Sequence, residues 1–217
     1  MPEIEITYSL ERMTRLESLQ LPSVKIERDD PPSLQVLTSI TSLTCSLGQY
    51  PRLCPLIQAP QLAALKLILQ EERSEDISTF SPGDFEDLPI NELISTLIIV
   101  VPLGTPDDIG ISPDSEAQEE HKFIEGFQHF RAVSRLELEG RTLPRFLQIL
   151  STDHTSLIKL EHLVISNRDV EEGVLTCFLS TYYAIRQKTI SLSFEHCTNL
   201  DEEAVQRLHE KASRSDN

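Results

Sequence analysis

The sequence predicts an α/β fold in which short parallel strands, one from each of a series of repeats, form a single curved sheet. An apolar triplet with the spacing Leu-x-x-Leu-x-Leu occurs seven times, and the starts of successive triplets are 24, 22, 32, 39, 27 and 29 residues apart. The intervals are long enough for the crossover connections that parallel strands require. The triplets are Leu16/Leu19/Leu21, Ile40/Leu43/Cys45, Leu62/Leu65/Leu67, Ile94/Leu97/Ile99, Val133/Leu136/Leu138, Leu160/Leu163/Ile165 and the weaker Thr189/Leu192/Phe194.

Each triplet is expected to form one strand whose apolar residues point into the core. The fourth and sixth residues follow the period of two that a half-buried strand requires, and the first packs just before the strand. The residues between them then lie on the opposite face of the sheet. We therefore expect residues 1–217 to form a single domain of about seven irregular repeats, with the sheet on the concave face and helices or irregular crossovers on the convex face.

Three crossovers and the segment after the last triplet carry helical signals. Residues 119–131 contain an apolar stripe at helical spacing, formed by Phe123, Ile124, Phe127 and Phe130. Helices are also expected over residues 143–150, where Pro144 suits a first turn, over residues 169–185, where Asp169 is the candidate N-cap, and from about residue 201 onward.

Other crossovers are predicted to be irregular. The prolines in residues 29–32 and 50–52 exclude more than a single helical turn there, because proline lacks a backbone donor and restricts its predecessor. Residues 74–89 and 102–115 contain turn signals and little to bury. We expect residues 102–121 to form an acidic, mobile loop.

The net charge of −16 is concentrated in one segment. Residues 71–120 hold 14 acidic residues against the single base Arg73, a net charge of −13. Such a segment repels the phosphate backbone, so we expect no nucleic acid partner. Most charge runs are solvated surface, and a docking site for a basic partner is the alternative.

Composition indicates a folded protein that stays inside the cell. The chain is 39% hydrophobic and 25% charged, and no apolar run approaches the length that spans a bilayer. Its start lacks the features of a secretory signal. The four cysteines form neither a CxxC pair nor a disulfide framework, which favours a reducing compartment, cytoplasmic or nuclear. We expect no membrane contact.

The motifs of common enzymes are absent from the sequence. There is no GxGxxG, GxxxxGK[ST], HExxH or GxSxG, so no cofactor is predicted. His121 and His129 lie two helical turns apart without a third ligand, and a metal site is not expected. Cys177 lies in an apolar helical segment, where a small buried side chain is more typical than a nucleophile. Cys197 is adjacent to His196, but neighbouring residues of an extended chain point to opposite sides, which is poor geometry for a thiolate–imidazole pair. A Cys-dependent hydrolase is therefore only a minor alternative, and we expect no catalytic residues.

The triplets resemble those of leucine-rich-repeat proteins over roughly residues 12–210. Residues 192–208 resemble the cysteine-containing repeats of F-box adaptor proteins, and Leu62-Ala63-Ala64-Leu65-Lys66-Leu67 resembles fungal members of that group. The resemblance implies a target-recognition module of the ubiquitin-ligase adaptor type. In the family, the position after each strand is usually Asn or Cys, and the chain departs from this pattern. The residues at this position are Val24, Gly48, Gln70, Pro102, Arg141, Arg168 and Cys197, and only Cys197 fits well. No F-box module is visible, so contact with a cullin adaptor is not expected.

A non-catalytic protein-binding module is the function that these patterns favour. The candidate binding residues share the solvent side of the central strands and are Lys66, Ile68, Ile98, Val100, Arg135, Glu137 and Val164. Two alternatives stay open. In the first, the strand of Ile98 and Val100 is buried on both faces, so that the acidic loop or a helix covers these two residues. In the second, the end repeats need a missing part to cover them, and the chain is a truncated scaffold fragment. The sequence leaves the target and the oligomeric state undetermined.

Overall fold

The computed structural model describes residues 15–21, 35–68, 88–101, 126–140, 144–153, 155–166 and 170–213. The predicted acidic loop at 102–121, residues 29–32 and nearly all of residues 74–89 lie outside these ranges. Within the described ranges, no helix is long and apolar enough to cross a membrane.

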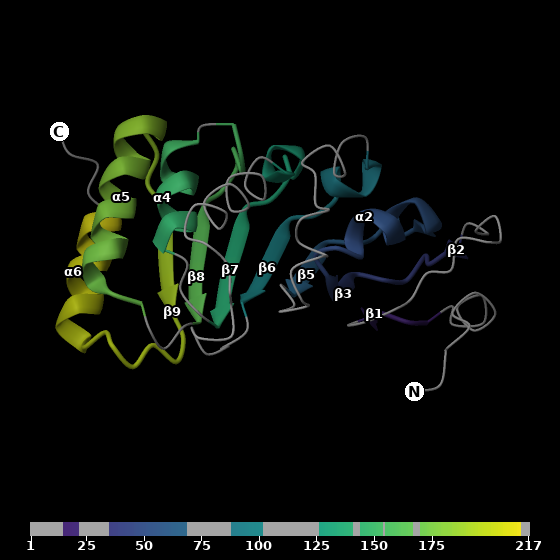
Figure 1. Cartoon of the computed structure of the whole chain (residues 1–217), viewed down its shortest axis with the longest axis horizontal. Coiled ribbons are helices and arrows are strands. Elements are labelled where there is room, and N and C mark those ends of the chain that lie inside the picture. The colour runs from purple at the N-terminus through teal and green to yellow at the C-terminus, as the bar shows by residue number, and fades with distance from the viewer. Residues whose placement is uncertain are drawn as a thin grey trace, which may run out of the picture.

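The fold is built on one parallel sheet of seven strands, which confirms the sequence prediction at that level. The strands pair in the order in which they occur along the chain, so each strand lies next to the strand of the preceding and of the following triplet (Figure 1). They are β1 (Ser18–Leu21), β3 (Ser42–Ser46), β5 (Ala64–Ile68), β6 (Thr96–Val101), β7 (Arg135–Gly140), β8 (His162–Ser166) and β9 (Ser191–Phe194).

The strand register aligns equivalent positions of all seven triplets. The fourth triplet residues pair from strand to strand without a slip, and this row is Leu19, Leu43, Leu65, Leu97, Leu136, Leu163 and Leu192. All seven of these leucines are buried. Register is strongly specified because a slip by one residue would turn every leucine to the opposite face.

A backbone hydrogen bond is repeated at the entrance to each strand after the first. The amide of the first strand residue donates to the carbonyl of the residue that precedes the neighbouring strand, as from Ser42 to Glu17 at 3.2 Å and from Arg135 to Ser95 at 3.1 Å. Equivalent bonds run from Ala64 to Thr41, Thr96 to Ala63, His162 to Ser134 and Ser191 to Glu161. Successive strands therefore begin in the same manner, although the connections between them differ in length.

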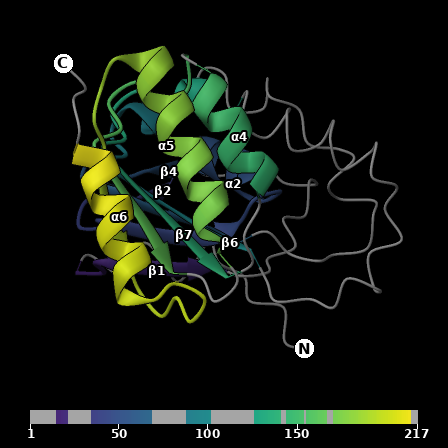
Figure 2. The same cartoon turned by 90° about the vertical axis from the view of Figure 1, so that its left-hand side faces the viewer.

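The crossovers change from short helical turns to long helices along the chain. Those after β3, before β6 and before β7 contain α2 (Tyr50–Leu53), η1 (Cys54–Leu56), η3 (Pro89–Glu92) and η5 (Phe127–His129). The later ones contain α4 (Pro144–Thr152) and α5 (Glu172–Arg186), and α6 (Glu202–Ser213) follows β9. A small second sheet pairs β2 (Gln35–Val36) with β4 (Ile57–Gln58). Figure 2 shows α2, α4 and α5 on the same side of the main sheet.

Three of the four predicted helices are present, and they are α4, α5 and α6. The prediction of at most a single helical turn at residues 50–52 is confirmed by the four-residue α2. Helix α4 begins at Pro144 as expected. Helix α5 begins later than predicted, with Glu171 as its N-cap, and Asp169 lies outside the described residues. The prediction for residues 119–131 is wrong at its described end, where a 3₁₀ turn ends at His129. Phe130 leaves helical geometry there, with φ of −90° and ψ of 67°, and its ring packs edge-to-face on Phe127, with ring centroids 6.0 Å apart.

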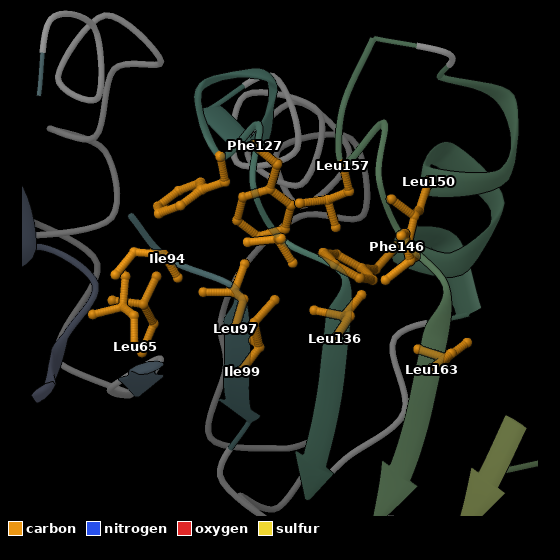
Figure 3. Close-up of a cluster of buried hydrophobic side chains, with 14 of the residues drawn as sticks. Leu65, Ile94, Leu97, Ile99, Phe127, Leu136, Phe146, Leu150, Leu157 and Leu163 are labelled. Carbon is orange, nitrogen blue, oxygen red and sulfur yellow. The ribbon is translucent and has the colours of Figure 1, made fainter. Parts of the chain in front are cut away.

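The hydrophobic core lies between the main sheet and the crossovers. Leu65, Leu97, Leu136 and Leu163 point toward Phe127 and Phe146, whose rings contact each other edge-to-face at 5.8 Å (Figure 3). The buried Tyr50 hydroxyl donates a 2.5 Å hydrogen bond to Asn91, which joins two crossovers inside the core. The core fills one face of the sheet and leaves the other face for the candidate site.

Candidate protein-binding face

The face of the sheet opposite the core carries the residues between the buried leucines, and we name it the second face. The strand register arranges it in three rows across the strands. The rows are Ser42, Ala64, Thr96, Arg135, His162 and Ser191; then Thr44, Lys66, Ile98, Glu137, Val164 and Ser193; then Ser46, Ile68, Val100, Glu139 and Ser166.

Six of the seven predicted binding residues lie together on three adjacent strands. Lys66 and Ile68 are on β5, Ile98 and Val100 are on β6, and Arg135 and Glu137 are on β7. All six are half-buried, and the two residues of β6 lie at the centre of the group. The register therefore brings together side chains that are up to 71 residues apart in the chain.

Val164 is the exception, and the expectation that it is exposed is wrong. Its side chain is 0% exposed although it belongs to the second face. The register places this short side chain directly beside the longer Glu137. Thr44 and Ser46 on β3, which the alternation also places on this face, are buried as well, at 9% and 7% exposure. The accessible part of the face is therefore centred on β5, β6 and β7.

An ion pair joins the two strands on either side of β6. The Nζ atom of Lys66 on β5 lies 2.6 Å from Oε2 and 2.8 Å from Oε1 of Glu139 on β7. Lys66 pairs with Ile98 in the register and Glu139 pairs with Val100, so the ion pair crosses β6 diagonally between these two apolar residues. It covers part of the apolar surface that the sequence predicts as a binding patch.

Glu139 is the residue of this site that the predicted set lacks. Its position on the solvent side of β7 follows from strand alternation, but its partner lies 73 residues away. The repeat pattern predicts that β5 and β7 flank β6, but it does not indicate which side chains reach across β6 to each other. The pairing of Lys66 with Glu139 is therefore a product of the sheet topology.

Further charged groups lie along β7 and after β9. The guanidinium of Arg135 lies 3.5 Å from the carboxylate of Glu137, which is longer than an ordinary charge-assisted hydrogen bond. At the end of β8, the hydroxyl of Ser166 donates to Glu195, which follows β9, at 3.4 Å. Arg135 and Glu137 thus lie on β7 next to the apolar residues of β6, and the Lys66–Glu139 pair crosses between Ile98 and Val100.

Three of the four thiols, those of Cys45, Cys54 and Cys197, lie in structural positions. Cys45 and Cys54 are buried, and burial raises the pKa of Cys45 well above its ordinary value and that of Cys54 to about 12. The thiol of Cys197 donates to the carbonyl of Ile165 on the neighbouring strand at 3.3 Å. Cys177 is exposed on α5, so the expectation that it is a buried apolar residue is wrong. These contacts describe no activated nucleophile within the described residues.

The histidines do not gather into a ligand set in the part of the chain that the structure describes. His129 contacts Gln128, with 3.3 Å between their side-chain nitrogens, and His121 lies outside the described residues. His196 has a left-handed backbone, with φ of 56°, and is exposed. In these ranges, no three His, Cys, Asp or Glu side chains are placed to hold a metal ion together.

Comparison with known proteins adds no family assignment. No protein-family model matches the chain, and none of the curated proteins compared with it is similar in sequence. A functional proposal for this chain therefore depends on the geometry of the second face and on the repeat pattern.

Proposed function

We propose that the chain is a curved leucine-rich-repeat solenoid that binds another protein through its second face and performs no catalysis. The proposal is supported by seven parallel strands in chain order and by the backbone bond that recurs at each strand entrance. Stacked repeats of one strand and one crossover give an extended sheet face suited to binding.

The observation that carries the proposal is the apolar group Ile68, Ile98 and Val100 on two neighbouring strands. These side chains are half-buried, Arg135 and Glu137 lie on the neighbouring β7, and the Lys66–Glu139 pair crosses between Ile98 and Val100. Apolar residues bordered by charged groups are the composition of protein-binding sites. Val164 takes no direct part because it is fully buried.

The resemblance to F-box adaptor proteins extends the proposal to target recognition inside the cell. In such a role the second face would hold the target while another module or protein connects it to a ligase. The four cysteines are free, which agrees with a reducing compartment. We do not propose direct contact with a cullin adaptor through the repeat.

The proposal is tested by panning a phage-displayed library of random short peptides against the chain. Recovered peptides are then measured by fluorescence anisotropy with the wild type, with Ile98→Asp and with the control Ile185→Asp, which makes the same change at an exposed site on α5. We expect Ile98→Asp to weaken binding by about tenfold or more, as at the centre of an interface, and Ile185→Asp to have no effect.

Folding is checked in the same experiment by far-UV circular dichroism and thermal unfolding. Both variants are expected to keep the wild-type spectrum, because both side chains contact solvent. If Ile98→Asp unfolds, the milder Val100→Thr replaces it, since valine and threonine have nearly the same shape. Equal binding by all folded variants would refute the assignment of the second face.

A further inference from the structure

We infer that the partner segment held by the second face is apolar and basic, and that one of its arginine side chains displaces Lys66 from Glu139. The inference rests on the proposed function and adds the chemistry of the partner to it. It is argued from the geometry of the Lys66–Glu139 ion pair, its exposure and the charge of the chain.

The geometry makes the ion pair an obstacle to anything that docks on β6. Lys66 and Glu139 lie on the two strands that flank β6 (Figure 1), and neighbouring strands are about 4.8 Å apart. Both side chains therefore lean over β6 to reach the 2.6 Å contact between them. A partner that packs on both Ile98 and Val100 has to move this pair aside.

The exposure of the ion pair makes it exchangeable. The side chains of Lys66 and Glu139 are 31% and 27% exposed, so water reaches both groups. Ion pairs in such positions contribute little to stability, because solvent screens them and holding two long side chains costs entropy. A partner whose charged side chain binds Lys66 or Glu139 more strongly than these two residues bind each other can take the place of one of them. The sheet stays folded when this happens.

The charge of the chain decides which of the two residues the partner takes. The net charge is −16, of which residues 71–120 carry −13, and it attracts cations and repels anions during approach to the chain as a whole. On the second face itself, Glu137 lies on the same strand and side as Glu139, and Glu195 lies close by at Ser166. An incoming cation therefore enters a region where carboxylates outnumber their basic partners.

Arginine is the cation that suits this position. Glu139 presents both carboxylate oxygens to Lys66, and a guanidinium makes two parallel hydrogen bonds to such a carboxylate where an ammonium acts as a point charge. Apolar side chains on the same segment would then cover Ile98 and Val100. The partner segment thus combines arginine with aliphatic residues on one side.

The test uses a labelled peptide in which Leu and Arg alternate at every second position with Ser between them, so that an extended chain shows both on one side. A matched peptide carries Glu in place of Arg. Affinities are measured for the wild type, Lys66→Met and Glu139→Gln. The controls are Lys211→Met and Glu202→Gln, which make the same charge changes at exposed sites of α6.

Breaking the ion pair from its two sides is expected to have opposite effects. Lys66→Met removes the competitor and raises affinity for the Arg peptide about threefold or more, whereas Glu139→Gln removes the acceptor and lowers it about tenfold. Each control is expected to stay within about twofold of the wild type, because exposed charges act weakly. Binding is also expected to require Ile98, as measured with Ile98→Asp.

Four results would overturn the inference. If both variants bind more tightly, the ion pair is only a steric obstacle. If Glu139→Gln binds more tightly and the Glu peptide is preferred, the partner is acidic. If each variant matches its α6 control, the attraction is non-specific. If the Arg peptide shows no Ile98-dependent binding, the inference fails, while the library-derived peptides still decide separately whether the second face binds protein.

Discussion

Gly140, the last residue of β7, lies against the backbone of Val101, its pairing partner at the end of β6. A Cβ atom built on Gly140 would lie 1.9 Å from the Val101 carbonyl oxygen, and the glycine has φ of +90°. Both the close approach and the left-handed backbone require a residue without a side chain. The glycine therefore fixes how the two central strands of the second face end.

Gly140→Ala is expected to lower the free energy of unfolding by about 2 kcal/mol or more, because the new methyl group forces both strands to shift. The measurement is equilibrium urea denaturation. The matched control is Gly173→Ala at the start of α5, where a Cβ meets nothing within 4 Å. That change is expected to stabilise the protein by up to about 1 kcal/mol, since alanine is the better helix former. Equal effects of the two substitutions would contradict the role assigned to Gly140.

Acid sensitivity is expected from Asp153, which follows α4. Partial burial by itself would raise the pKa of this carboxyl group, but hydrogen bonds from Ser156 and Thr155 outweigh burial and hold the pKa below its ordinary value. A lowered pKa in the folded state stabilises the protein above the ordinary pKa of aspartate. That stabilisation is lost as the pH falls through the lowered value.

The prediction is that Asp153→Asn is less stable than the wild type at neutral pH and that the difference shrinks in acid. Urea midpoints measured from neutral to strongly acidic pH give this difference directly. Glu161→Gln, which removes the same charge at an exposed site, is expected to follow the wild type throughout. A constant gap between wild type and Asp153→Asn would show that the hydrogen bonds matter and the titration does not.

The strands were predictable from the sequence because their signal is local. Each strand carries its own apolar pair at period two, so Leu65 and Leu67 or Leu97 and Ile99 identify a strand without knowledge of its neighbours. Prolines likewise identified α4 and the single turn of α2. Local patterns of this kind also produced the six second-face residues that the register brings together.

The contacts between coils were not predictable, because they depend on the folded arrangement. The guanidinium of Arg186 at the end of α5 donates to the carbonyls of Asp153, Ser156 and Leu157, residues 29 to 33 positions away. The Lys66–Glu139 pair is of the same kind. The error at Val164 has another cause. Strand alternation predicts on which face of the sheet a side chain lies, but it does not predict how exposed that side chain is. The apolar stripe suggested a helix, whereas Phe127 lies in a 3₁₀ turn and packs edge-to-face on Phe130 and Phe146.

The four cysteines are expected to react with iodoacetamide in an order that separates structural thiols from a nucleophile. Cys177 is exposed on α5 and should react first. Cys45 and Cys54 are buried, and burial raises the pKa of both thiols, so neither forms the reactive thiolate at neutral pH. They should be protected in the native protein and react only when urea unfolds it. Peptide mass spectrometry after timed labelling gives the four rates.

Cys197 is the thiol for which the result decides between functions. Its Sγ atom donates to the Ile165 carbonyl and also lies 3.5 Å from the Glu195 carbonyl. Cys197 is half-buried and Cys177 is exposed, so we expect Cys197 to react more slowly than Cys177. Cys197→Ser keeps a donor at this position and should leave peptide binding unchanged. Faster labelling of Cys197 than of Cys177 would instead favour the Cys-dependent hydrolase over a non-catalytic binding module.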